Sequence, residues 1–158
     1  MTVLSLGLAT SFQPLSAQAL KLSDAAVPPG GRVSLDLTLL SPSHAQPSAL
    51  QWEMSFPVDC CSLIEGFPKT GEAAEAADKG VSCTTRQNTA DTRTILCVLY
   101  GGQKPIPNGV VAKLDFRIAP RASAGQVHIK VDKGLAVSVD LKRTTIPAAE
   151  GIITVRPQ

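Results

Sequence analysis

The stretch RVSLDLTL, residues 32–39, alternates strictly between apolar and polar side chains. Successive side chains of an extended chain point to opposite sides, so the two kinds separate onto two faces. The apolar face holds Val33, Leu35, Leu37 and Leu39. This period of two predicts a β-strand with one face in a core and the other in water.

The same pattern extends in both directions along the chain. Residues 50–56 place Leu50, Trp52, Met54 and Phe56 on one face, and residues 109–118 place Val110, Ala112, Leu114, Phe116 and Ile118 on one face. Further strands are predicted over residues 20–27, 61–64, 81–85, 94–100, 126–131, 135–141 and 151–155. Turn residues separate these segments, and this spacing is typical of a β-sandwich, here with about nine strands.

Helices contribute little to this prediction. Residues 71–79, GEAAEAADK, have helix-forming composition, and we expect about two turns there. Long periodicity of 3.6 residues is absent from the sequence, which argues against α/β architectures. The predicted fold class is therefore all-β, an antiparallel β-sandwich.

Length and charge narrow the possible functions. The chain has 158 residues, of which 44% are hydrophobic, so it can form one domain with a substantial core. The net charge is only +2 and the sequence has no basic run, which argues against binding to nucleic acid. After the N-terminal segment, the sequence has no stretch near the roughly 20 apolar residues of a transmembrane segment.

The first 19 residues, MTVLSLGLATSFQPLSAQA, resemble an export signal. Residues 3–9 are a short apolar stretch, and Ala17-Gln18-Ala19 is a small-x-small site of the kind that signal peptidase cuts. We therefore expect residues 1–19 to be a signal peptide or its C-terminal part, and residues 20–157 to be a single extracytoplasmic domain. A plain N-terminal extension is the alternative.

The four cysteines fit an exported protein. Cys83 and Cys97 flank a polar stretch with apolar strands outside it, which predicts a disulfide across a hairpin. Cys60 and Cys61 are adjacent, so their side chains should point to opposite faces of a strand. Zinc sites use ligand pairs at short spacings that this sequence lacks, and we predict no metal.

Residues that could carry catalysis are isolated. The sequence lacks the G-x-S-x-G, G-x-G-x-x-G, G-x-x-x-x-G-K-[ST] and H-E-x-x-H motifs. Three carboxylates fall on outward strand positions, where we expect exposed, solubilising charges: Glu53, Asp115 and Asp140. His44 lies in a polar loop, and four further aspartates stand alone without calcium-loop spacing: Asp59, Asp78, Asp91 and Asp132. We predict no catalytic residue, no cofactor and no enzymatic activity.

Several segments, taken in order, resemble a cohesin module of the cellulosome type. They are AVPPGGRVSLDLTLL (residues 26–40), ALQWEMSFP (49–57), residues 81–101 with VLYG at their end, NGVVAKLDFRI (108–118) and GIITV (151–155). The resemblance covers about residues 20–157. It implies a nine-stranded jelly roll that binds a partner module, the dockerin, by protein–protein contact on a sheet face.

The resemblance also indicates which strands would face a dockerin: residues 49–56, 81–85, 94–100 and 126–131. Their outward positions give the candidate binding residues Gln51, Glu53, Ser55 and His128. Tyr100, at the end of an apolar strand before Gly101-Gly102, is a further candidate as an exposed aromatic residue. The chain departs from cellulosomal scaffolds, because it is a single module without repeats or a linker. It also contains no dockerin-like D-x-[DN]-x-D-G loop of its own.

Three functions remain open at this point. One is a secreted or cell-surface binding module with a dockerin-like partner, which an exposed apolar patch with a polar rim would favour. Another is a carbohydrate-binding module on the same fold, with a polysaccharide ligand, which a row of exposed aromatic side chains would favour. The third is a structural domain of a surface assembly.

Overall fold

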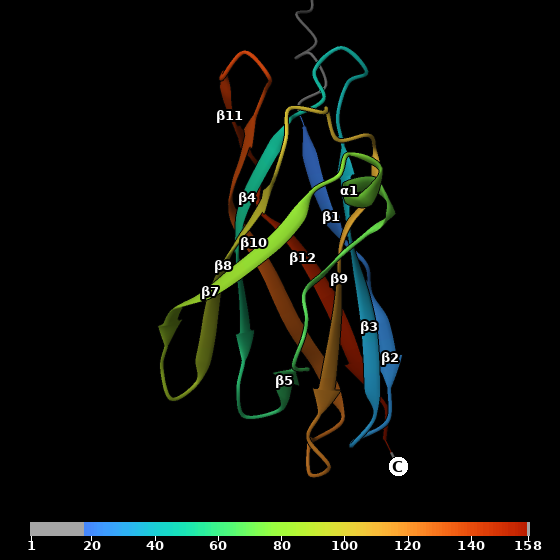
Figure 1. Cartoon of the computed structure of the whole chain (residues 1–158). Helices are drawn as coiled ribbons and strands as arrows, with labels where there is room; N and C mark the ends of the chain where they lie inside the picture. Colours follow the sequence, from blue (N-terminus) through green and yellow to red (C-terminus); the bar gives the residue numbers. More distant parts are fainter. Residues whose placement is uncertain (1–17, 158) are drawn as a thin grey trace, which may run out of the picture.

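The alternating strands assemble into two packed β-sheets in the computed structural model, which describes residues 18–157 (Figure 1). The five-stranded sheet has the order β1-β3-β9-β5, and β6 also pairs with β9. Its strands are β1 (Ala19–Leu22), β3 (Arg32–Leu40), β5 (Cys61–Leu63), β6 (Lys69–Thr70) and β9 (Gly109–Ile118). All pairs within this sheet are antiparallel.

The second sheet has seven strands in the order β2-β12-β10-β4-β8-β7, and β11 also pairs with β10. Its strands are β2 (Ala25–Val27), β4 (Ala49–Pro57), β7 (Gly80–Asn88), β8 (Thr92–Tyr100), β10 (Gly125–Val137), β11 (Arg143–Ile146) and β12 (Ala149–Val155). The pairs are antiparallel except for β2 and β12, which run parallel. The two sheets confirm the predicted all-β sandwich.

The described residues hold twelve strands rather than about nine, and the differences have local causes. Residues 20–27 divide into β1 and β2, which join different sheets. Residues 126–131 and 135–141 are not two strands, since β10 runs from Gly125 to Val137 through a β-bulge. Strands of two to four residues, such as β6, are too short for periodicity to reveal.

The helix is also shorter than expected. Helix α1 spans only Glu72–Ala76, and it packs Ala73 and Ala74 into the core beside β9. No helix within residues 18–157 is long and apolar enough to cross a lipid bilayer.

The core lies between the two sheets. Trp52 on β4 is fully buried, as its place among the apolar positions predicted. Phe56 on β4 and Phe116 on β9 meet edge to face with ring centroids 5.2 Å apart, which joins the two sheets. The other large, fully buried side chains are Leu35, Leu37, Leu39, Leu50, Met54, Leu99, Ile106, Leu114 and Ile118.

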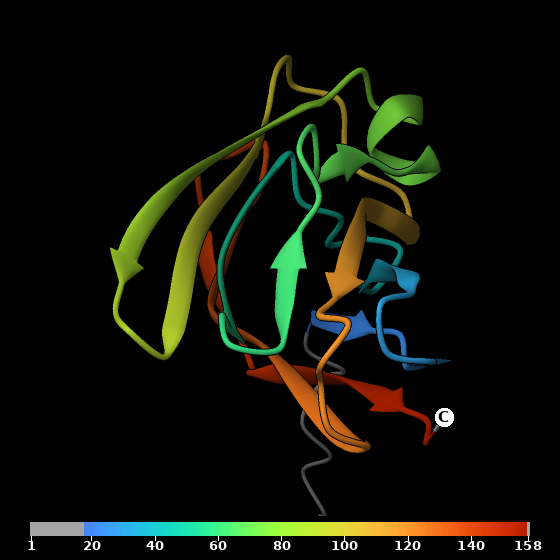
Figure 2. The same ribbon diagram turned by 90° about the horizontal axis from the view of Figure 1, so that it is seen from below.

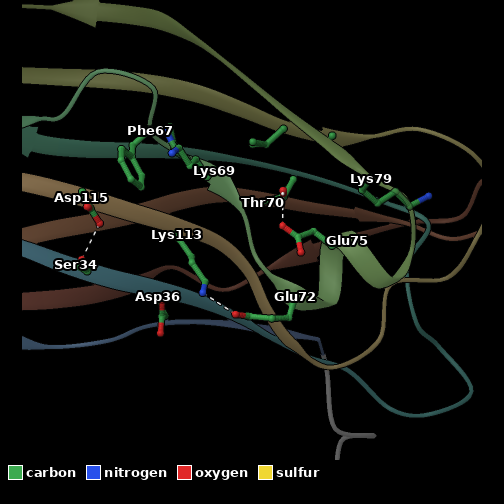
Figure 3. A pocket seen from close by; sticks show the side chains of 13 residues that line it. Ser34, Asp36, Phe67, Lys69, Thr70, Glu72, Glu75, Lys79, Lys113 and Asp115 are labelled. Atoms are coloured by element: carbon green, nitrogen blue, oxygen red, sulfur yellow. Dashed lines mark hydrogen bonds and ion pairs between the residues drawn. The ribbon is translucent and has the colours of Figure 1, made fainter.

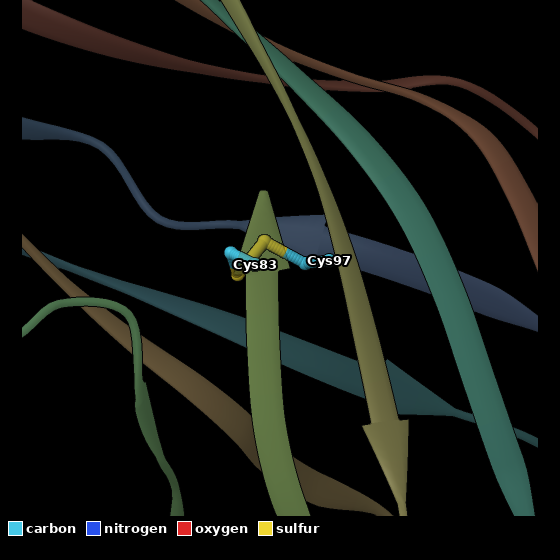
Figure 4. The surroundings of a disulfide bond; sticks show 2 residues. All are labelled: Cys83 and Cys97. Carbon is cyan, nitrogen blue, oxygen red and sulfur yellow. A yellow bond between two sulfur atoms is a disulfide. The ribbon is translucent and has the colours of Figure 1, made fainter. Parts of the chain in front are cut away.

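The predicted disulfide between Cys83 and Cys97 is present (Figure 4). The two residues lie directly opposite each other on β7 and β8, with Cα atoms 4.1 Å apart. This separation is slightly shorter than the 4.4–6.8 Å that is usual for disulfides. The disulfide faces the core, because Cys97 is fully buried. Its register partner on β4, the neighbour of β8 on the side away from β7, is the fully buried Trp52.

The other two cysteines are free and differ in exposure, as expected for neighbours at the start of a strand. Cys61 is buried, and its thiol donates to the carbonyl oxygen of Pro57 at 3.0 Å. Burial raises the pKa of the Cys61 thiol to about 12, so this thiol stays protonated and unreactive. Cys60 is half-buried, and burial raises the pKa of its thiol as well.

The predicted signal peptide lies outside the described residues except for Gln18 and Ala19. Gln18 is buried and donates to the carbonyl oxygen of Ala45, and Ala19 begins β1.

Candidate functional site

The four strands that the resemblance assigned to a dockerin lie side by side in the seven-stranded sheet. Their order is β10-β4-β8-β7, so they form one continuous surface. Seen along the strands, β7 and β8 stand at one side of the molecule, away from β1 and β3 (Figure 2). We call the side of these four strands that points away from the core the outer face.

Three predicted residues lie together on the outer face of β4. Gln51 and Ser55 are half-buried, and the Ser55 hydroxyl lies 2.8 Å from the hydroxyl of Thr94 on β8. Glu53 lies between them, as alternation requires. The strand period thus places these three side chains correctly.

Glu53 is nevertheless not the exposed charge that we expected. The residue is only 8% exposed, because two long cationic side chains reach over it, one from the adjacent strand β10 and one from β7, which lies beyond β8. Arg86 Nε lies 3.5 Å from Glu53 Oε1, and Lys133 Nζ lies 3.3 Å from Glu53 Oε2. The prediction was wrong about exposure because alternation assigns a face but cannot show what covers it.

The other two predicted residues lie at opposite ends of the outer face. Tyr100 ends β8, is 53% exposed, and has its ring close to Gly80 on β7. His128 is exposed on β10, and its Nδ1 contacts the carboxylate of Glu150 on β12. His128 and Ser55 line the same cavity, of about 520 Å³.

The sequence analysis missed the apolar members of the outer face. Leu135, Gln51 and Val98 form one row across β10, β4 and β8, and Glu53 and Leu96 lie in the next row. The three apolar side chains, Leu96, Val98 and Leu135, are half-buried. We call Leu96, Val98, Leu135 and Tyr100 the apolar strip.

A signal for this strip was present in the sequence. Residues 95–100 are apolar without interruption apart from Cys97, so β8 carries apolar side chains on both faces. Such a run is typical of a strand whose two faces are both covered. In β8 one face is covered by the core, and the other is the outer face.

The remaining candidate residues do not converge on a site. Asp115 lies on the five-stranded sheet, Asp140 is exposed in the turn between β10 and β11, and His44 is exposed in the loop before β4. Asp115 was expected to be exposed but is buried, because Arg32 and Ser34 on β3 bond to its carboxylate. Within the described part of the chain, no group of three or more His, Cys, Asp or Glu side chains could hold a metal ion.

A groove of about 830 Å³ lies on the five-stranded sheet, beside β9, β6 and α1 (Figure 3). Two of its carboxylates bind groups within the groove: Lys113 Nζ lies 2.6 Å from Glu72 Oε1, and the Thr70 hydroxyl donates to Glu75 Oε1 at 3.3 Å. The hydrogen bond from Lys113 lowers the pKa of Glu72. These internal pairs give the groove a structural role, and the outer face is the better candidate site.

Comparison with known proteins finds relatives by structure only. No protein-family model matches the sequence, and no curated protein matches it significantly. Among solved structures, the Coh-OlpA cohesin of Clostridium thermocellum, in complex with a dockerin, gives a TM-score of 0.71 at 15% identity, over 89% of this chain and 100% of that chain.

Two further cohesins are similar to a comparable degree. The sixth cohesin of scaffoldin B from Acetivibrio cellulolyticus, in complex with a mutant dockerin, gives a TM-score of 0.70 at 13% identity, over 89% of this chain and 100% of that chain. The non-cellulosomal cohesin of the archaeon Archaeoglobus fulgidus gives 0.70 at 10% identity, over 90% of this chain and 94% of that chain. At such identities the likeness concerns the fold, and this chain has the β-sandwich fold of the cohesin domains.

Proposed function

We propose that this protein is a non-catalytic recognition module of cohesin type, which binds a dockerin-like protein through the outer face. The observation that carries the proposal is the apolar strip. It lies on the outer face of the sheet, and polar and charged side chains surround it. Protein–protein interfaces combine an apolar centre with a polar rim in this way.

The structural neighbours support the same kind of partner, since two of the three cohesins described above were solved with a dockerin bound. The disulfide supports an extracytoplasmic location, because disulfides persist mainly in oxidising compartments. A sugar-binding surface is less well supported. In the described part of the chain Tyr100 is the one strongly exposed aromatic residue, too few for a stacking platform.

The test uses recombinant dockerin modules from the same organism, chosen by their D-x-[DN]-x-D-G loops and measured by calorimetry with calcium. We expect at least one to bind. Val98→Asp places a charge in the centre of the apolar strip and should weaken that binding at least thirtyfold, the effect of losing a hot-spot residue worth about 2 kcal/mol.

The matched control is Thr38→Asp, which adds the same charge to a half-buried, outward position on β3 of the other sheet. It should leave the affinity unchanged, and both variants should melt within a few degrees of the wild type. The proposal fails if no dockerin binds, or if Val98→Asp binds as tightly as the wild type. Binding on a glycan array in the absence of dockerin binding would favour the carbohydrate-binding alternative.

A further inference from the structure

Two β-bulges face each other across β4 and β8. In β7 the register with β8 shifts between Thr85 and Gln87, which leaves Arg86 as the extra residue. In β10 the register with β4 shifts between Asp132 and Leu135, where Lys133 has a left-handed backbone with φ of 48°. A bulge redirects a side chain, and a left-handed residue other than glycine costs energy that its surroundings must offset.

Both redirected side chains reach the same carboxylate. Arg86 spans β8 to bring its guanidinium to one oxygen of Glu53, and Lys133 brings its ammonium to the other oxygen. Glu53 thereby holds two cations above the outer face, one on each side. Its own side chain is only 10% exposed, so a molecule that approaches this face cannot easily reach the carboxylate.

The accessible charge around Glu53 is therefore positive. The side chains of Arg86 and Lys133 are 63% and 68% exposed. Lys130, paired with Ser55 on β4, is a further exposed cation. Asp132, paired with Glu53, and Glu150 on β12, paired with Lys130, are exposed carboxylates. An approaching surface thus meets three cations and two carboxylates, and the cations Arg86 and Lys133 are the ones that flank Glu53 beside the apolar strip.

We infer that the partner presents an acidic side chain, aspartate or glutamate, to Arg86 and Lys133, next to an apolar contact on the strip. This inference rests on the proposed function and specifies the chemistry of its partner. Charge complementarity at an interface selects partners and accelerates association. Glu53 is the positioning residue in this arrangement, because it fixes the two cations and does not touch the partner.

The test does not depend on knowing the natural partner. A display library of a small helical scaffold with a randomised surface is selected on the wild-type domain and counter-selected on Val98→Asp, so that only binders of the outer face remain. We expect these binders to be enriched in aspartate and glutamate relative to the library. They should bind Arg86→Gln/Lys133→Gln at least tenfold more weakly, and their affinity for the wild type should fall as salt is raised.

Two further variants make the result specific. Lys21→Gln/Arg117→Gln removes the same charge from exposed positions on the five-stranded sheet and should leave binding unchanged. Because Arg86→Gln/Lys133→Gln leaves Glu53 unpaired, a triple variant that adds Glu53→Gln removes the uncompensated charge. The triple variant should fold like the wild type and still bind at least tenfold more weakly.

Binders without acidic enrichment, or binders that the triple variant retains at full affinity, would overturn the inference. Polygalacturonate is the probe for an anionic polysaccharide. If it binds the wild type and Val98→Asp but not the triple variant, the ligand is an anionic polysaccharide and the inference of an acidic protein partner is overturned. Failure of the proposed function gives a different result: no dockerin module binds, while acidic binders still emerge from the library.

Discussion

At the scale of single residues, the main surprise is that two outward carboxylates are buried. Glu53 and Asp115 alternate with core residues, and this pattern usually marks a solvated charge. In each case an arginine from another strand of the same sheet reaches over the carboxylate: Arg86 reaches Glu53 across β8, and Arg32 on the adjacent strand β3 reaches Asp115. Such contacts depend on which strands become neighbours, so local sequence cannot reveal them.

Asp115 makes the acid stability of the protein depend on its ion pair. Burial, the largest single influence, raises the pKa of its carboxyl, but the hydrogen bonds from Ser34 and Arg32, together with the charge of Arg32, outweigh burial and lower it. A carboxyl whose pKa is lowered by folding stabilises the fold above its unfolded pKa, about 3.9. This stabilisation is lost as the pH falls through the lower, folded pKa.

We therefore expect Asp115→Asn to have a lower melting temperature than the wild type at pH 7. Between pH 5 and pH 2, the melting temperature of Asp115→Asn should fall by less than that of the wild type. Thermal melts recorded by circular dichroism across this range test the prediction. Asp91→Asn, in the exposed turn between β7 and β8, is the control and should follow the wild-type curve. Parallel curves for Asp115→Asn and the wild type would show that the ion pair contributes no pH dependence.

At the scale of elements, β7 is the strand that most needs a covalent link. It lies at the edge of the seven-stranded sheet, pairs only with β8, and is largely exposed from Thr84 to Asn88. An edge strand with few buried side chains has little hydrophobic stabilisation of its own. The disulfide from Cys83 to Cys97 holds β7 in register, and with it the bulge that carries Arg86.

Removing this link should destabilise the domain by roughly 3 kcal/mol, as expected for a closed loop of this size. The variant Cys83→Ala/Cys97→Ala should unfold at a lower urea concentration than the wild type, as measured by tryptophan fluorescence. Cys60→Ala, which removes a free, half-buried thiol, is the control. If the double variant and the wild type share one unfolding midpoint, the disulfide does not stabilise the fold.

At the scale of the whole molecule, the sequence predicts the sandwich well because several of the long strands, β3, β4 and β9 among them, carry their own periodicity. What it cannot predict are features that arise only between strands. The division of residues 20–27 between two sheets and the bulges at Arg86 and Lys133 depend on long-range pairing. The same limit applies to the site: Gln51 and Ser55 follow from alternation, whereas the cations that cover Glu53 do not.

The parallel pairing of β2 and β12 gives the domain a mechanical property. The register joins Ala25 to Ile153 and Val27 to Val155, and the amide of Arg156 donates to the carbonyl of Val27 at 2.9 Å. Tension applied between Ala25 and Arg156 pulls these strands in opposite directions along their length, so their hydrogen bonds bear the load together in shear. Single-molecule pulling between these two residues should require a higher force than pulling between Lys133 and Pro147, which peels β11 from β10 one pair at a time. Equal forces in the two geometries would contradict this prediction, whereas a clear difference would show that the pairing of β2 with β12 resists unfolding under tension.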